Sequence, residues 1–134
     1  MTRFIYDVAV RWSDMDAYGH VNNARFLTLY EEARVAMFFV GARAQGLTSF
    51  EDGIVISRQE IDYLRPVDYG DAVRIEMWVS RLKAASFTVS YELFDGGVLA
   101  GRASSVCVPY NLAEQFPRRL TGPEHDFLEP YLEA

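Results

Sequence analysis

Hydrophobic and polar residues alternate at the start of the chain. Over residues 4–12 the even-numbered positions are apolar or aromatic, whereas Arg3, Asp7 and Arg11 lie on the opposite side. A period of two is typical of a strand with one buried face. The alternation stops in residues 13–23, which collect Asp, Gly, His and Asn, residues that favour turns. We therefore expect an N-terminal strand followed by a loop.

A helical spacing of apolar residues begins at residue 24 and continues to about residue 41. Asn23 is the predicted N-cap, and Gly41 is predicted to end the helix. Polar positions are few, so the helix is expected to be buried on most sides. The predicted inner stripe consists of Phe26, Tyr30, Ala33, Met37 and Val40.

Four further segments have the composition of strands: residues 53–64, 72–82, 86–94 and 98–108. Asp95-Gly96-Gly97 has the signature of a tight hairpin, and Thr121 with Glu124 resembles the capping box of a short C-terminal helix. Four strands in succession predict a meander, and hence an α+β domain whose five-stranded antiparallel sheet wraps around the long helix. The exposed edge of such a sheet would be covered by pairing with a second copy.

The composition narrows the class of protein. The 134 residues fit a single domain, residues 1–134, with an ordinary hydrophobic core. A formal charge of -6 argues against nucleic acid or an anionic membrane as the main partner. No apolar run resembles a signal peptide or a membrane span, and the single cysteine, Cys107, fits buried packing in a reducing compartment. We therefore expect a cytoplasmic protein.

The loop before the helix concentrates the groups that could perform chemistry. It holds Asp14, Asp16 and His20, and it leads into a helix N-terminus, whose free N–H groups and partial positive charge can polarise a carbonyl. The backbone N–H near Asn23 is the candidate donor. Asp16 could attack a carbonyl carbon directly or could deprotonate a water that attacks instead. By the residues alone, a turn-forming role is the favoured interpretation of Asp16.

Residues 13–27 and 30–34 resemble the signature of the 4-hydroxybenzoyl-CoA thioesterase family of hotdog proteins. The similarity extends through residues 60–67, 70–71 and 81–87, and covers roughly residues 4–110. It implies a hotdog fold and hydrolysis of an acyl-CoA thioester to the free acid and CoA. It also implies that Asp16 is the catalytic carboxylate and that the N–H of Asn23 polarises the carbonyl. One branch of the family has a His at the position of Asn23, and this chain does not.

The resemblance also implies where the substrate binds. The turn before Ser86 is expected near the CoA phosphates, with Arg81 and Lys83 supplying positive charge. Gly19, His20 and Tyr63 are further expected substrate contacts. No metal or redox cofactor is implied, and CoA is part of the substrate. The sites are expected between two subunits of a dimer or tetramer, with the acyl group in an apolar pocket; the acyl class stays open.

Several alternatives accompany this interpretation. A calcium loop starting at Asp14 fails because Arg25 stands where a bidentate Glu is needed. An Asp-x-Asp phosphatase fails because such folds alternate strands with helices, and the hydratase branch of the hotdog fold has a different spacing and an Asn-Pro pair. An acyl-carrier-protein thioesterase and a non-catalytic acyl-binding hotdog protein stay open as alternatives. Asp14 is expected to cap a turn, and His20 could be a hydrogen-bonded loop residue.

The helix contributes one more open question. Glu31 and Arg34 have the spacing of an ion pair on a helix surface. Alternatively, Glu31 or Glu32 could place a carboxylate in the site of the opposing subunit.

Overall fold

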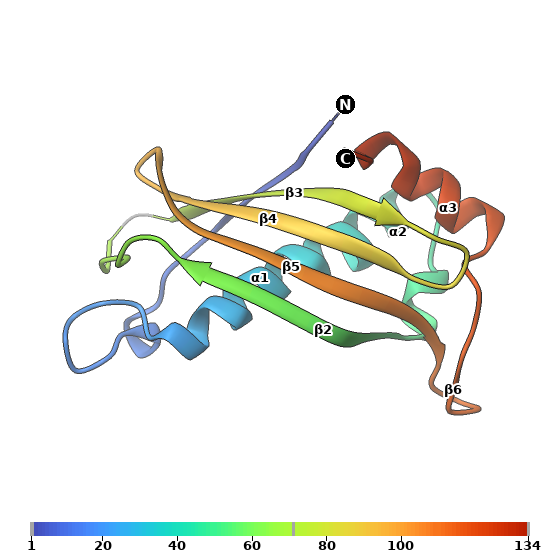
Figure 1. Cartoon of the computed structure of the whole chain (residues 1–134), viewed down its shortest axis with the longest axis horizontal. Coiled ribbons are helices and arrows are strands. Elements are labelled where there is room, and N and C mark those ends of the chain that lie inside the picture. The colour runs from blue at the N-terminus through green and yellow to red at the C-terminus, as the bar shows by residue number, and fades with distance from the viewer. Residues whose placement is uncertain (1, 71, 134) are drawn as a thin grey trace.

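The computed structural model describes residues 2–70 and 72–133, and it shows a strongly curved antiparallel sheet around one long helix (Figure 1). The sheet has the strand order β1-β3-β4-β5-β2, and a short sixth strand pairs with β5. This arrangement confirms the hotdog architecture that the resemblance implies. The strands are β1 (Phe4–Val8), β2 (Ile54–Tyr63), β3 (Val73–Leu82), β4 (Phe87–Asp95), β5 (Val98–Asn111) and β6 (Phe116–Pro117).

The predicted meander is correct for only three of the four strands. β3, β4 and β5 follow one another in the sheet, but β2 pairs with β5 instead of β3 and lies at the far edge. The period of an apolar pattern shows that a segment is a strand but not which strand it pairs with, so this crossover was not predicted. β1 and β2 are consequently the two outer strands of the five, and β2 is the longer of them.

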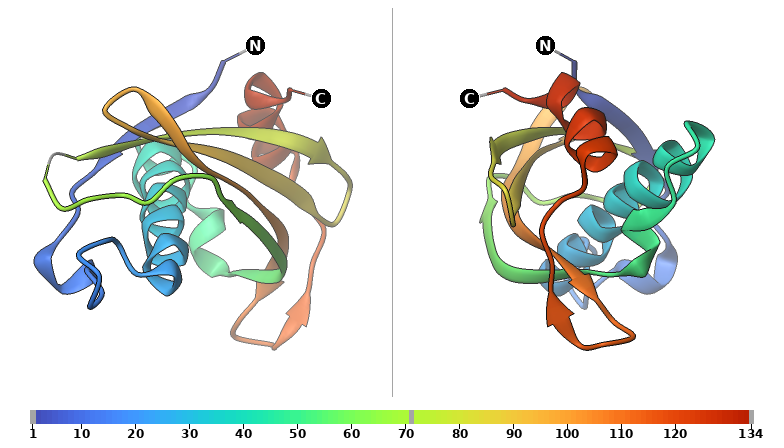
Figure 2. Two further views of the ribbon diagram at one scale, coloured as in Figure 1. Left: turned by 60° about the vertical axis from the view of Figure 1, so that its left-hand side comes forward. Right: turned by 90° about the vertical axis from the view of Figure 1, so that its right-hand side faces the viewer.

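The central helix runs further than predicted. It comprises α1 (Asn23–Val35), a π-helical turn η2 (Ala36–Gly41) and α2 (Ala42–Ala44), and it lies along the concave face of the sheet (Figure 2). The prediction that Gly41 ends the helix is wrong, because the backbone of Gly41 is helical, with φ -64 and ψ -46. The left-handed glycine is Gly46, with φ +81, just beyond α2.

The inner face of the helix follows the predicted stripe as far as the π-helical turn. Phe26, Tyr30, Ala33 and Met37 are buried, but Val40 is 64% exposed. Val40 lies within this turn, which holds more residues than an α-helical turn and therefore places them at other angles about the axis. The expectation that the helix is buried on most sides is also only partly correct, because Leu27, Val35 and Phe39 are exposed in the single chain.

The remaining elements frame this core. The first strand ends at Val8, earlier than predicted, and a 3-10 turn η1 (Trp12–Asp14) follows. Both glycines of the predicted hairpin are left-handed, with φ +59 at Gly96 and +81 at Gly97. Cys107 is buried, as predicted. The other helical elements are η3 (Ser49–Asp52), α3 (Gly122–Leu128) and η4 (Glu129–Tyr131).

The predicted capping box at the start of α3 is confirmed. Thr121 Oγ1 accepts a hydrogen bond from the Glu124 N–H at 3.2 Å, and Glu124 Oε1 accepts one from the Thr121 N–H at 2.8 Å. Among the described residues, no helix has both the length and the apolar character needed to cross a membrane.

Candidate active site

Asp14 anchors the loop in front of α1. Its side chain is 1% exposed, and its Oδ2 accepts a hydrogen bond from the Arg11 N–H at 2.9 Å. The Arg11 guanidinium lies 2.9 Å from Oδ1 and holds the pKa of this carboxyl below its ordinary value. The Asp14 carbonyl in turn accepts a hydrogen bond from the Asn22 N–H at 2.8 Å. Asp14 is therefore a structural carboxylate, as predicted.

Asp16 uses only one of its two carboxylate oxygens to hold the loop. Oδ1 accepts hydrogen bonds from the N–H groups of Tyr18, at 2.9 Å, and His20, at 3.2 Å. Oδ2 accepts none from the residues that the structure describes. The side chain is half-buried. Asp16 thus forms the turn expected of a loop aspartate and still presents one oxygen to an incoming group.

The helix begins directly beside this carboxylate. The sequence predicts Asn23 as the N-cap, but the N-cap is Asn22. Its Oδ1 accepts a hydrogen bond from the Ala24 N–H at 2.9 Å. Asn23 is consequently the first helical residue, a position whose N–H has no intrahelical partner. No described residue accepts a hydrogen bond from the Asn23 N–H. This donor, at the positive end of the helix, is free to bind a carbonyl oxygen.

A single open pocket of about 370 Å³ brings these groups together. Its walls come from the loop, the first turn of α1 and the end of β2. The Tyr63 hydroxyl connects the end of β2 to the start of α1 by donating a hydrogen bond to the Asn23 carbonyl at 2.8 Å. The lining residues are Asp16, His20, Val21, Asn23, Phe26, Tyr63, Leu64, Arg65 and Pro66.

Residues 66–68 hold the loop against the end of β2. The Val21 N–H donates to the Val67 carbonyl at 2.8 Å, and His20 Nε2 lies 3.7 Å from Asp68 Oδ1. The sequence alone favours a solvated side chain for Arg65, and the residue is exposed, but it also lines the open pocket. In the sequence, the position of Arg65 directly after a predicted strand and before Pro66 is the feature that could have indicated a role in the site. The crossover of β2 is what brings it beside the loop.

The expected substrate contacts fall into two groups. Asp16, His20, Asn23 and Tyr63 share the pocket. Gly19 is not in the lining; with φ +79 it shapes the turn, and its N–H donates to the Asp16 carbonyl at 3.2 Å.

Arg81, Lys83 and Ser86 lie elsewhere in the single chain. Lys83 and Ser86 close the β3–β4 turn through a 2.9 Å hydrogen bond, and Arg81 is exposed on the last part of β3. This turn and the Asp16 loop occupy opposite ends of the molecule (Figure 1). Arg81, Lys83 and Ser86 are therefore not part of the Asp16 pocket of the same chain.

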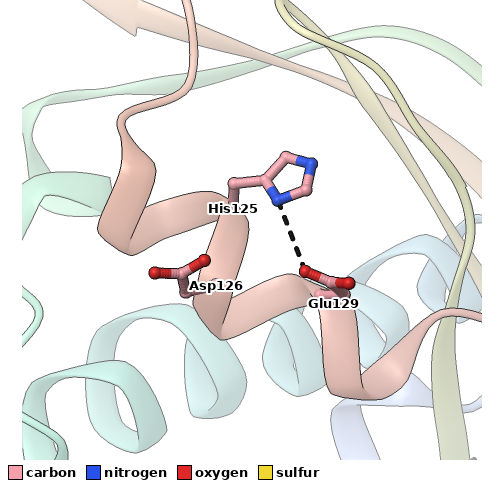
Figure 3. A group of neighbouring side chains, drawn as sticks. All are labelled: His125, Asp126 and Glu129. Atoms are coloured by element: carbon pink, nitrogen blue, oxygen red, sulfur yellow. Dashed lines mark ion pairs between the residues drawn. The ribbon is translucent and has the colours of Figure 1, made fainter.

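One group of possible metal ligands stands apart from the pocket. His125, Asp126 and Glu129 gather on the outer side of the C-terminal helix, with His125 Nδ1 3.7 Å from Glu129 Oε2 (Figure 3). All three are exposed, and exposed acidic groups are common without an ion. That the reaction needs no metal stays a prediction.

Comparison with known proteins gives a consistent result. The profile of the thioesterase-like superfamily matches residues 10–129. The chain is 33% identical over 112 residues to a 1,4-dihydroxy-2-naphthoyl-CoA hydrolase of Gloeothece citriformis, covering 78% of each chain. It is 32% identical over 83 residues to the long-chain acyl-CoA thioesterase FadM of Escherichia coli, covering 62% of this chain and 63% of that protein.

Solved structures agree over almost the whole chain. A predicted thioesterase from Bacillus stearothermophilus superposes with a TM-score of 0.88 at 25% identity, covering 99% of this chain and 98% of that one. A thioesterase from Thermus thermophilus, solved with coenzyme A and Zn, has a TM-score of 0.79 at 30% identity, covering 92% of this chain and 95% of that one. The family profile spans well over half of the sequence, and the chain belongs to the thioesterase-like superfamily.

Proposed function

We propose that this protein hydrolyses an acyl-CoA thioester to the free acid and CoA, with Asp16 as the catalytic carboxylate. The observation that supports this most directly is that Asp16 and Asn23 line the same open pocket. Among the described residues, Asp16 Oδ2 accepts no hydrogen bond and the Asn23 N–H donates none. The two groups have complementary tasks, since one provides a base or nucleophile and the other provides a donor for the carbonyl oxygen.

Two routes fit these groups. In the first, Asp16 Oδ2 attacks the thioester carbon, the C–S bond breaks to release CoA, and water hydrolyses the resulting mixed anhydride. In the second, Asp16 accepts a proton from a water molecule that attacks the same carbon. In both routes negative charge develops on the carbonyl oxygen, where the Asn23 N–H and the positive end of α1 stabilise it.

The complete site, in this proposal, needs a second copy of the chain. The free edge of β2 is ten residues long, and unpaired edge strands favour pairing with another strand. In an antiparallel pair of β2 strands related by a two-fold axis, the β3–β4 end of the partner lies at the Asp16 end of the first chain. Arg81 and Lys83 of the partner subunit would then be placed to meet CoA phosphates at a site formed by both chains.

The direct test is release of free thiol from a panel of acyl-CoA esters that differ in chain length, branching and aromatic character. We expect Asp16-dependent release of CoA from at least one class. No release above background from any of them would contradict the proposal. Release only from acyl groups carried on acyl carrier protein would instead assign the same chemistry to a protein-borne substrate, and acyl binding without turnover would indicate a non-catalytic protein.

A further inference from the structure

A second hollow lies between the far half of the central helix and the start of β2. It has a volume of about 180 Å³, and most of its wall is apolar. Two charged side chains, Glu31 and Arg34, interrupt that wall. The apolar lining residues are Val35, Phe38, Phe39, Ile54 and Ile56. We call this hollow the Arg34 groove.

Arg34 is an unusual residue to find in such a wall. The sequence predicts an ion pair on the helix surface, but the Arg34 side chain is only 11% exposed, and the closest carboxylate oxygen, Glu31 Oε2, is 4.0 Å away from Nη2. The carboxylate itself belongs to a side chain that is 65% exposed to solvent. The pair that the spacing predicts is therefore present, but it is long, and it joins an exposed carboxylate to a largely buried cation.

The Arg34 guanidinium is held on one side only. Nη1 donates to the Tyr91 hydroxyl at 2.9 Å and lies 3.4 Å from Ser105 Oγ. The Tyr91 hydroxyl donates to Ser105 Oγ at 2.9 Å, and Ser105 Oγ donates to Gln59 Oε1 at 2.8 Å. This chain of neutral groups fixes the plane of the guanidinium without neutralising its charge.

The other two nitrogens of the guanidinium carry N–H donors. Within residues 2–70 and 72–133, Nε and Nη2 of Arg34 have no acceptor at hydrogen-bonding distance. Burying a charge is costly unless the group is paired and hydrogen-bonded. A guanidinium locked by neutral partners and lining an apolar groove is a preorganised donor for an oxygen atom that enters the groove.

The position of the groove connects it to the reaction. Ile54 and Ile56 stand at the beginning of β2, whereas Tyr63 of the Asp16 pocket stands at its end. In the antiparallel pair of β2 strands proposed above, the beginning of one strand faces the end of the other. The groove of one subunit thus adjoins the Asp16 pocket of its partner, on the side where an acyl group would extend.

We infer that Arg34 determines substrate specificity: it donates hydrogen bonds to an oxygen substituent, hydroxyl or carboxylate, on the otherwise apolar acyl group bound at the Asp16 pocket of the partner. This inference rests on the proposed function. The groove walls accept the hydrocarbon part of the acyl group, and the guanidinium distinguishes an oxygenated acyl group from a plain one. Loss of a hydrogen bond to a charged donor lowers kcat/KM by roughly tenfold or more.

The test compares matched acyl-CoA esters that differ only in a terminal methyl, hydroxyl or carboxylate group, in saturated and aromatic series. For the wild type we expect kcat/KM to be higher for at least one oxygenated ester than for its methyl counterpart. Arg34→Gln should reduce that preference roughly tenfold or more while changing the methyl ester much less. Arg43→Gln, which removes an exposed guanidinium from α2, is the matched control and should keep the preference.

The outcomes separate this inference from the proposed function. A preference for the hydroxyl ester or for the carboxylate ester supports the inference and identifies the oxygen group. A wild type without any preference, or an Arg34→Gln variant that slows all esters equally, would overturn it. If thermal unfolding shows that Arg34→Gln does not fold, Arg34→Lys, which keeps the charge but loses the planar fork, must weaken the preference. No release of CoA from any of these esters by the wild type would instead reject the proposed function, and undiminished turnover by Asp16→Asn would reject Asp16 as its catalytic carboxylate.

Discussion

The Asp16 loop and the C-terminal segment around α3 both use a carboxylate to organise backbone N–H groups, but they do so to different extents. Glu124 is fully buried, and both of its oxygens are occupied by Arg118, each at 2.7 Å, with further bonds from Ser49 and the Thr121 N–H. Asp16 is half-buried, and only Oδ1 is occupied. The difference indicates which carboxylate is structural and which remains available to a substrate.

The hydrogen bonds that a carboxylate already accepts therefore tell more about its role than its residue type does. Glu124 has an opposite charge, Arg118, in contact, so removal of Arg118 leaves a buried charge uncompensated. Asp16 has backbone partners that fix its position and no counter-charge in the side-chain contacts of the described residues. Substitutions at Asp16 should therefore affect turnover, whereas substitutions around Glu124 should affect stability.

The largest effect is expected for Asp16→Asn. The amide oxygen can still accept the hydrogen bonds from Tyr18 and His20, so the loop should keep its structure, whereas the group replacing Oδ2 can neither attack nor take up a proton. We expect kcat to fall by several orders of magnitude with the melting temperature nearly unchanged. Steady-state kinetics and thermal unfolding check this, with exposed Asp126→Asn as control. Near-normal turnover would remove Asp16 from the mechanism.

The opposite pattern is expected for Arg118→Met. It leaves the buried Glu124 without its charged partner, and we expect the free energy of unfolding to fall by about 3 kcal/mol. Arg119→Met, which removes the adjacent but exposed guanidinium, should change stability much less. Chemical denaturation measures both. Equal stability of the two variants would show that the Glu124 cluster is not the structural counterpart of Asp16.

Low pH should reduce the stability that the Glu124 cluster contributes. Burial opposes ionisation of Glu124, but its bonds to Arg118, Thr121 and Ser49 outweigh this and lower its pKa below the ordinary value of 4.5. The folded state therefore binds this proton less readily than the unfolded state. The stability that Glu124 contributes is present above about pH 4.5 and is lost as the pH falls through the lower pKa of the folded state. In Glu124→Gln, unfolding measured across this range should lose part of its acid dependence; an unchanged profile would contradict the assignment.

The smallest effect is expected at the edge of the Asp16 pocket. Tyr63→Phe removes the hydrogen bond from the Tyr63 hydroxyl to the Asn23 carbonyl, which helps to position the first turn of α1 at the pocket, and we expect kcat/KM to fall about fivefold. Because Tyr63 is 46% exposed, the melting temperature should hardly change. Tyr69→Phe, at an exposed tyrosine outside the pocket lining, is the control. A comparable loss in both variants would remove Tyr63 from the site.

Local features of this fold follow from the sequence, and long-range ones do not. The hairpin at Gly96 and Gly97 and the capping box at Thr121 are predictable because each depends on a few adjacent residues. The crossover of β2 depends on a contact with β5, which periodicity does not encode. The burial of Arg34 likewise depends on Tyr91 and Ser105, far along the chain.

The Asp16 site shows the same division. The loop and the helix N-terminus are adjacent in sequence, so the sequence by itself places Asp16 and Asn23 near each other. Arg65 and Tyr63 join them only because β2 returns to the same end of the sheet. The predicted N-cap is wrong by one residue, since Asn22 and Asn23 are both good capping residues and the sequence does not choose between them.

The π-helical turn η2 gives this helix a tolerance to changes in chain length. A π-helical turn contains one residue more than the helix around it requires, so deleting a residue within Ala36–Gly41 restores an ordinary α-helix instead of breaking one. Arg34 and the loop and helix residues of the Asp16 pocket all precede this turn and would keep their orientation. Relatives are therefore expected to align with a one-residue gap inside the helix here, where a gap would elsewhere signal a broken element.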